Sequence, residues 1–112
     1  MDEINFDEFL KIEIRVGTIK RAEDFPEAHK PAIKLWIDFG EKIGEKKSSA
    51  QITLHYETKA LIGKQVLAVT NFPPRQIGKF MSEVLVLGLS DGGGGIVLIS
   101  PDQRVKPGER LH

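Results

Sequence analysis

The side chains that most often carry catalysis or hold metal ions are few in this sequence, and their spacing does not fit such chemistry. The three histidines are His29, His55 and His112, and no two have the four-residue spacing that places a zinc-binding pair on one helix face. The chain has no cysteine, which excludes disulfides, thiolate catalysis and cysteine-based zinc sites. We therefore predict no metal site and no cofactor.

Two other groups of residues resemble catalytic or phosphate-binding sites only in part. Ser48 and Ser49 could supply a nucleophile and His55 a base, but no nucleophile elbow surrounds them, and serines are common polar residues of strands. The run DGGGG at 91–95 is not followed by the Lys-Ser or Lys-Thr pair of a phosphate loop, and the GxGxxG pattern is absent. We therefore predict that this protein is not an enzyme.

The strongest candidate for a binding site is the segment 71–85, which reads NFPPRQIGKFMSEVL. Pro73 and Pro74 cannot donate backbone hydrogen bonds, so they end the preceding strand and stiffen the chain into an extended form. A stiff segment loses little entropy when its side chains bind a partner. Those side chains include the hydrogen-bond donors Asn71, Arg75, Gln76, Lys79 and Ser82, and the apolar residues Phe72, Phe80 and Met81.

This mixture of side chains is compatible with three interpretations. Basic groups interleaved with aromatic rings suit a single strand of nucleic acid, because charge meets phosphate and rings stack on bases. They suit an extended peptide about as well, since Phe and Met side chains fill adaptable pockets. In the third interpretation Phe72, Ile77 and Phe80 are core residues under a long loop, and Arg75 is an ordinary surface charge.

Charge is balanced overall but unevenly distributed along the chain. The 112 residues include 16 basic and 16 acidic side chains, whereas proteins dedicated to coating DNA are usually basic. Acidic residues dominate positions 1–13, and none occurs at 58–82, where Lys59, Lys64, Arg75 and Lys79 lie. The basic stretch is either a local surface for a polyanion or a solvated face.

The composition is typical of one soluble domain. Apolar residues make up 40% and charged residues 29%, and no repeat or linker divides the chain. The acidic N-terminus does not resemble a signal peptide, and the longest apolar stretch, 84–90, is too short to cross a bilayer, so we predict a cytoplasmic location. We expect a single domain over 1–112, with a helical segment at 1–11 and a turn-rich segment at 100–112.

The elements that would position these residues are mostly short strands. Period-two alternation predicts strands over 12–20, 33–39 and 48–54, with a bulge or bend at Gly17 and with Trp36 opposite the apolar row of its strand. The apolar runs 66–69 and 84–89 predict strands covered on both faces, and DGGGG predicts a flexible hairpin that leads to a strand over 96–99. Asn5 is the expected N-cap of a first helix, and Gly63 the expected end of a second helix over 57–62.

Five or six strands with one helix between the third and fourth indicate an all-β fold, specifically an OB-fold five-stranded Greek-key barrel. An SH3-like barrel is the alternative, because strand patterns alone separate the two poorly.

Six sequence blocks occur in an order that resembles the tRNA-binding-domain family, whose OB-fold modules occur alone or appended to methionyl- and phenylalanyl-tRNA synthetases. The blocks are RVGTI, HKPAIKLWIDFG, SSAQIT, LIGKQVLAV, NFPPRQI and SEVLVLG, and they extend from about residue 6 to the C-terminus. Within that family, KPAIKLWIDFG, SSAQIT and NFPPRQI look like the CsaA-type, export-related molecular chaperones.

The resemblance implies a homodimer that binds non-native or precursor polypeptides, formed largely through the terminal segments and carrying two symmetric grooves. Phe72, Phe80 and Met81 are the candidate peptide-binding residues, and Trp36 is expected either in the groove or in the dimer contact. The family's nucleic-acid surface would comprise Asn71, Arg75, Lys79, Ser82, Glu83, Lys30 and Lys34. The predicted function is thus a cytosolic, export-related chaperone, and a tRNA- or structured-RNA-binding module is the alternative.

Overall fold

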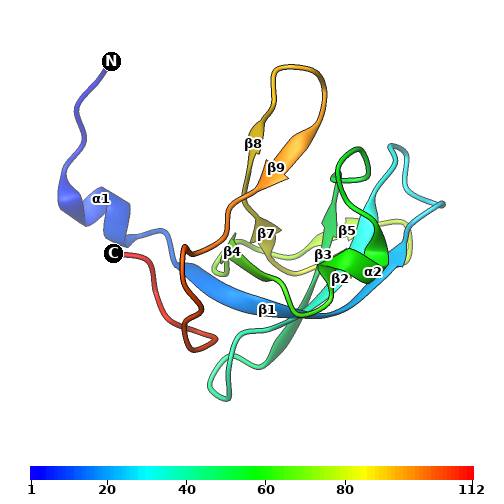
Figure 1. Cartoon of the computed structure of the whole chain (residues 1–112). Helices are drawn as coiled ribbons and strands as arrows, with labels where there is room; N and C mark the ends of the chain where they lie inside the picture. Colours follow the sequence, from blue (N-terminus) through cyan, green and yellow to red (C-terminus); the bar gives the residue numbers. More distant parts are fainter.

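Five antiparallel strands form the main sheet of the computed structural model, which describes residues 1–112 (Figure 1). Their order across the sheet is β3 (Glu45–Ala50), β2 (Ile33–Asp38), β1 (Ile14–Asp24), β4 (Gln65–Val69) and β7 (Leu85–Val86). Two hairpins accompany the sheet: β5 (Arg75–Ile77) with β6 (Phe80–Ser82), and β8 (Gly88–Ser90) with β9 (Ile96–Leu98). The helices are α1 (Phe6–Leu10) and α2 (Thr58–Leu61).

The sheet curls until its outer strands, β3 and β7, approach each other and nearly close a barrel. The contact is made at one end only, where the backbone N–H groups of Glu83 and Val84 donate to the carbonyl oxygen of Lys47 at 2.8 and 3.3 Å. The buried hydroxyl of Ser48 donates to the carbonyl oxygen of Val84 at 3.0 Å. Helix α2 lies between β3 and β4 in the chain. The predicted five-stranded all-β barrel is therefore confirmed.

The core confirms the alternation predicted for the second strand. Ile33, Leu35 and Ile37 of β2 are fully buried, and the residues between them are only partly buried. They pack with Ile19 of β1, Leu61 of α2 and other side chains of one large cluster. Burial of this apolar face is the main contribution to the stability of the barrel.

The longest strand, β1, contains a bulge, but the bulge is not at Gly17, where the sequence predicted a bulge or a bend. Its pairing with β4 is continuous through Gly17, and the register against β2 shifts between Ile19 and Arg21. A different constraint acts on Gly17: a Cβ atom there would lie 2.5 Å from Cγ2 of Ile37 and 2.7 Å from Cε1 of Phe39. The glycine is required by close packing against two core side chains.

Gly17→Ala is therefore expected to destabilise the fold by about 1–3 kcal/mol, because overpacking forces core side chains to move. The measurement is the free energy of unfolding in urea. Gly93→Ala is the matched control, since the nearest atom to its Cβ, Oδ1 of Asp91, is 3.6 Å away. We expect that control to change stability by less than about 0.5 kcal/mol. Equal effects at the two glycines would contradict the packing argument.

Three predicted strands differ from the structure. The first spans Ile14–Asp24 rather than residues 12–20. Strand β3 begins at Glu45 rather than residue 48 and ends at Ala50, so that Leu54 lies exposed in a turn. The run 84–89, predicted to be covered on both faces, exposes Leu85 and Leu89. The reason is that β7 lies at the open edge of the barrel and β8 belongs to a hairpin that projects from it (Figure 1).

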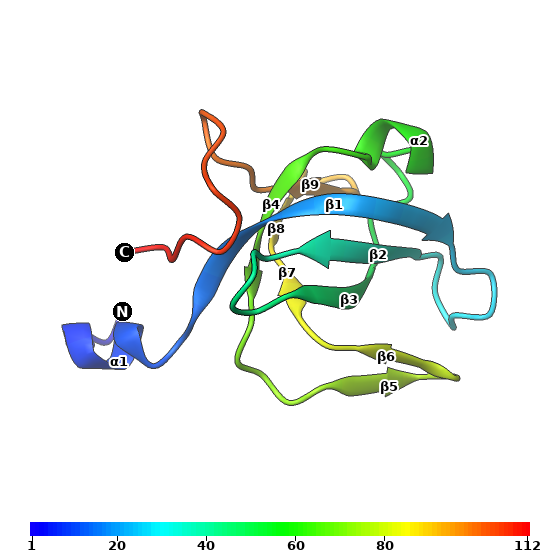
Figure 2. The same ribbon diagram turned by 90° about the horizontal axis from the view of Figure 1, so that it is seen from below.

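The predicted cap of α1 and the predicted glycine after α2 are confirmed, although α2 covers only Thr58–Leu61 of the predicted 57–62 and α1 buries no residue. Asn5 caps α1 through a capping box with Glu8, while Gly63 follows α2 with a φ of +86°. Helix α1 stands away from the barrel beside the C-terminus (Figure 2), and Phe6 and Leu10 are exposed. Neither helix is long and apolar enough to cross a membrane.

Candidate functional site

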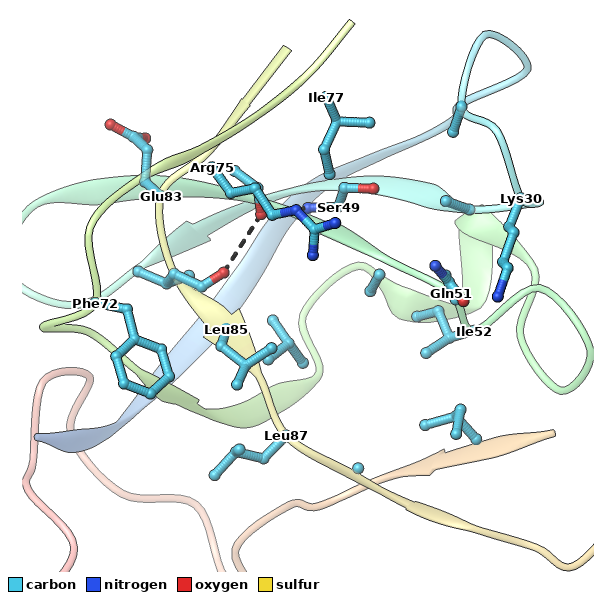
Figure 3. A pocket seen from close by; sticks show the side chains of 18 of the residues that line it. Lys30, Ser49, Gln51, Ile52, Phe72, Arg75, Ile77, Glu83, Leu85 and Leu87 are labelled. Carbon is cyan, nitrogen blue, oxygen red and sulfur yellow. Dashed lines mark hydrogen bonds between the residues drawn. The ribbon is translucent and has the colours of Figure 1, made fainter. Parts of the chain in front are cut away.

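A groove of about 840 Å³ opens where β3 and β7 diverge (Figure 3). Twelve of its 21 lining residues are hydrophobic, so its surface is mainly apolar. The apolar side chains include Ala50 at the end of β3 and Ile52 beyond it, Phe72 and Pro73 after β4, and Val84 to Leu87 around β7. The polar lining includes Lys30, Ser49, Gln51, Arg75, Ser82 and Glu83. Such a groove suits an apolar ligand that is oriented by a few polar contacts.

One wall of the groove is built by the segment 71–85, which is not the single extended stretch predicted from its prolines. The chain runs extended only as far as Ile77, turns at Gly78 with a φ of +60°, and returns as β6. Cross-strand pairing places Arg75 opposite Ser82 and Ile77 opposite Phe80, with Gln76 opposite Met81 between them. Because side chains alternate along strands, Gln76 and Met81 point to the other face of the hairpin.

Two of the four candidate peptide-binding residues hold this hairpin on the barrel. The Phe80 ring is buried and packs edge-on against Trp36, with ring centroids 6.0 Å apart, and against Phe25 at 5.5 Å. The guanidinium of Arg21 lies 4.2 Å from the centroid of the Trp36 ring on its strand neighbour. This aromatic cluster agrees with the interpretation of Phe80 as a core residue.

The other two candidates are exposed, and only one lines the groove. Phe72 lies at the groove with about half of its surface exposed, whereas Met81 lies outside it on the far face of the hairpin. Phe72 is therefore the only one of the four that the structure brings to the groove.

Several candidate nucleic-acid-binding residues form hydrogen bonds within the chain. The Asn71 side chain accepts from the backbone N–H of Glu13 at 2.9 Å and donates to the carbonyl of Lys11 at 2.8 Å, which fixes the chain leading into β1. Lys34 lies 4.7 Å from the Phe25 ring centroid, beside the aromatic cluster. These contacts give Asn71 and Lys34 structural roles.

Ser82 and Glu83 form the hydrogen bonds that a neighbouring strand would otherwise make with β3. Oγ of Ser82 accepts from the N–H of Ser49 at 3.1 Å, and Oε1 of Glu83 accepts from the N–H of Lys47 at 2.9 Å. Lys30, Arg75 and Lys79 are different, because they are exposed and make no ion pair. Of the candidate cations, those that remain free for a ligand are therefore at the groove and on the β5–β6 hairpin.

The sequence did not identify Gln51, Leu85, Val86 or Leu87 as groove residues. All four line the groove only because the edges of β3 and β7 meet across the barrel. That approach joins residues more than thirty positions apart, so no local pattern reveals it.

The β8–β9 hairpin, predicted to be flexible, is tied to the turn after β3. Nε2 of His55 lies 2.6 Å from Oδ2 of Asp91, and Oδ1 of Asp91 accepts from the N–H groups of Gly93 at 2.6 Å and Gly95 at 3.0 Å. The Gly93 hydrogen bond, followed by the His55 and Gly95 bonds, lowers the pKa of the Asp91 carboxyl. The ionised carboxylate thus orders the glycine-rich turn.

This lowered pKa predicts a pH-dependent contribution to stability. The contribution is present above the unfolded-state pKa of about 3.9 and is lost as the pH falls through the lower folded-state value. Asp91→Asn keeps an acceptor oxygen but removes the charge. We expect wild type to have the higher Tm at pH 7 and the difference to shrink below about pH 4. A Tm difference that stays constant from pH 7 to pH 2 would contradict the role of the charge.

The barrel topology and the open groove define the class of this protein as an OB-fold binding module. Residues 14–110 match the family model described as a putative tRNA binding domain, and the chain belongs to this family. The fold predicted from the sequence and the resemblance to this family are both confirmed.

The most informative similarities are to solved structures that the chain matches over their full length. It is 47% identical to the chaperone CsaA of Bacillus anthracis, with a TM-score of 0.93, covering 99% of this chain and 100% of that one. It is 53% identical to the CsaA chaperone protein of Picrophilus torridus, with a TM-score of 0.90, covering 98% and 100%.

Similarity to methionine–tRNA ligases covers this chain but little of those enzymes. The chain is 36% identical over 110 residues to the Porphyromonas gingivalis ligase, covering 98% of this chain and 16% of the ligase. It thus spans about 16% of the length of the curated relatives it matches. The family and the structural neighbours connect the chain to tRNA-binding and chaperone proteins rather than to a catalytic family.

Proposed function

We propose that this protein is a homodimeric cytoplasmic chaperone that binds non-native or precursor polypeptides before export. The observation that carries the proposal is the open, mainly apolar groove between β3 and β7, with Phe72 and Leu85 exposed at it. Apolar surface of this kind is costly to leave in water and suits the apolar segments that unfolded chains expose. The full-length similarity to CsaA chaperones supports the same function.

The proposed dimer contact uses the terminal segments. Exposed apolar side chains lie on both: Phe6, Leu10 and Ile12 at one end of the chain, and Val105 and Leu111 at the other. The two segments are joined, since the Arg110 guanidinium donates to the carbonyl of Leu10 at 2.6 Å. A second copy would cover this apolar surface and so stabilise a small domain.

tRNA binding is the second candidate function. It is favoured by the exposed cations Lys30, Arg75 and Lys79, which have no acidic partner, and by the family to which the chain belongs. A dimer would present two such sets of cations to one RNA, and two weak contacts on one ligand add up to higher affinity.

The deciding experiment titrates the protein with labelled, reduced and carboxymethylated α-lactalbumin and with labelled tRNA, at low and moderate salt, while its mass in solution is recorded. We expect a dimer that binds the unfolded polypeptide with little dependence on salt and binds tRNA weakly. Tight tRNA binding that falls steeply with salt, without binding of the polypeptide, would leave an RNA-binding module instead. A monomeric mass would contradict the dimer.

A further inference from the structure

The groove lies beside an incompletely paired edge of β3. The register of β2 and β3 pairs Ile33 with Ala50 and, continued, places Phe39 opposite Gly44. The N–H of Phe39 donates to the carbonyl oxygen of Gly44 at 3.0 Å, which identifies this as a hydrogen-bonded pair. Because hydrogen-bonded pairs alternate in antiparallel sheets, Ala50 directs its N–H and C=O toward β2. Ser49 and Gln51 then direct theirs away from β2, toward the groove that both residues line.

Side chains satisfy only the first part of this edge. The side chains of Glu83 and Ser82 accept hydrogen bonds from the N–H groups of Lys47 and Ser49, as described above. No hydrogen bond within the chain uses the carbonyl oxygen of Ser49 or the N–H of Gln51. The next two main-chain groups of the β3 edge are therefore available to a ligand in the groove.

The facing edge of β7 is open in the same way. The N–H of Leu87 donates to the carbonyl of Leu67 at 2.9 Å, so the residues that bond to β4 are Leu85 of β7 and Leu87 directly after it. Val86, between them, directs its N–H and C=O away from β4, and it lines the groove. Two unpaired strand edges thus face one apolar groove, which is the arrangement that accepts an added strand.

The charges at the groove indicate which side chains such a strand would carry. Lys30 and Arg75 are exposed at the groove without an acidic partner, while the Glu83 carboxylate is already bound to the N–H of Lys47. Two cations against one carboxylate leave the groove lining with a net positive charge. An acidic side chain on the ligand would complement it, with apolar side chains directed at the groove surface.

We propose that this groove binds its polypeptide as an extended strand added between the edges of β3 and β7, with its main chain bonded to Ser49, Gln51 and Val86. The ligand class is a segment in which apolar residues alternate with polar ones and include an acidic residue. This inference rests on the proposed chaperone function and adds a main-chain mode of recognition to it. Main-chain bonding tolerates many sequences, as a chaperone for varied clients requires.

The first test removes one donor from the protein. Gln51→Pro deletes the N–H that faces the groove, and Gln51→Ala deletes only the side chain. With labelled carboxymethylated α-lactalbumin as ligand, we expect the proline variant to bind about tenfold more weakly than the alanine variant, which lacks the same side chain but keeps the N–H. Thermal unfolding of both variants shows whether the barrel is intact. Equal binding by the alanine variant and a folded proline variant would overturn the inference.

The second test leaves the protein unchanged and alters the ligand. The probe is a fluorescein-labelled peptide, Ser-Val-Ser-Val-Glu-Val-Ser. It is compared with one version that is N-methylated at the valines and a second version that is N-methylated at the other residues. Alternate amides point to opposite edges of a strand, so each version blocks one edge. We expect at least one to bind about tenfold more weakly than the unmodified peptide.

The outcomes separate this inference from the function on which it rests. If all three peptides bind equally, the strand mode is wrong and the chaperone function stands. If the unmodified peptide does not bind while the unfolded polypeptide does, the strand mode is also wrong. If neither ligand binds at all, the proposed function itself has failed.

Discussion

Replacing Phe72 and Leu85 together by aspartate is expected to weaken binding of an unfolded polypeptide by roughly a hundredfold. Each side chain is 49% exposed and lies at the groove, so each has apolar surface left to bury against a ligand. Losing that burial at two positions, and placing carboxylates there instead, costs about 2–3 kcal/mol of binding free energy. The measurement is a fluorescence titration with labelled carboxymethylated α-lactalbumin.

The matched control places the same two charges on exposed leucines outside the groove. Leu54 is 65% exposed and Leu89 is 62% exposed, and neither lines the groove. Leu54→Asp with Leu89→Asp should leave polypeptide affinity within about threefold of wild type, because surface substitutions without partners have small effects. If the control loses as much affinity as the groove variant, polypeptide binding depends on general surface hydrophobicity and the groove is not the site.

The features that could be predicted from the sequence are those set by local chemistry. The alternation of Ile33, Leu35 and Ile37 fixes which face of β2 is buried, because successive side chains point to opposite sides of a strand. Asn5 and Glu8 are close enough in sequence to form the capping box of α1 by themselves. Such patterns were sufficient to predict the all-β barrel and the end of α2 before Gly63.

The groove was harder to predict because it depends on contacts between distant segments. Ser82 and Glu83 look like ligand-binding residues in the segment 71–85, yet their partners are backbone groups of β3 more than thirty residues away. Phe80 was a peptide-binding candidate, but the structure buries its ring against Trp36 and Phe25. In each case the type of side chain is compatible with both roles, and only the approach of two strands decides between them.

Gly17 shows the same limit for the backbone. A glycine inside a strand pattern is compatible with a bulge, a bend or close packing, and the sequence predicted a bulge or a bend. The structure instead places the bulge between Ile19 and Arg21 and packs Gly17 against Ile37 and Phe39. The choice depends on which side chains the barrel brings opposite the glycine, which the local sequence does not contain.

Arg75→Ala combined with Lys79→Ala is expected to weaken tRNA binding by about tenfold at low salt and to reduce the salt slope by roughly two. Both cations lie on the β5–β6 hairpin, are exposed and have no ion-pair partner, so their removal should not affect folding. Polypeptide affinity should change by less than about threefold, since exposed charges at the edge of an apolar site contribute little. Titrations with labelled tRNA at several salt concentrations measure the slope.

Lys42→Ala with Lys59→Ala is the control, because it removes two exposed cations from the β2–β3 turn and from α2. If it reduces tRNA affinity and the salt slope equally, the attraction reflects overall charge and the hairpin is not an RNA-binding surface. If the hairpin variant instead loses tRNA and polypeptide together, the two ligands share the groove that Arg75 lines. They would then compete, and bound tRNA would displace the unfolded polypeptide from the β3 and β7 edges.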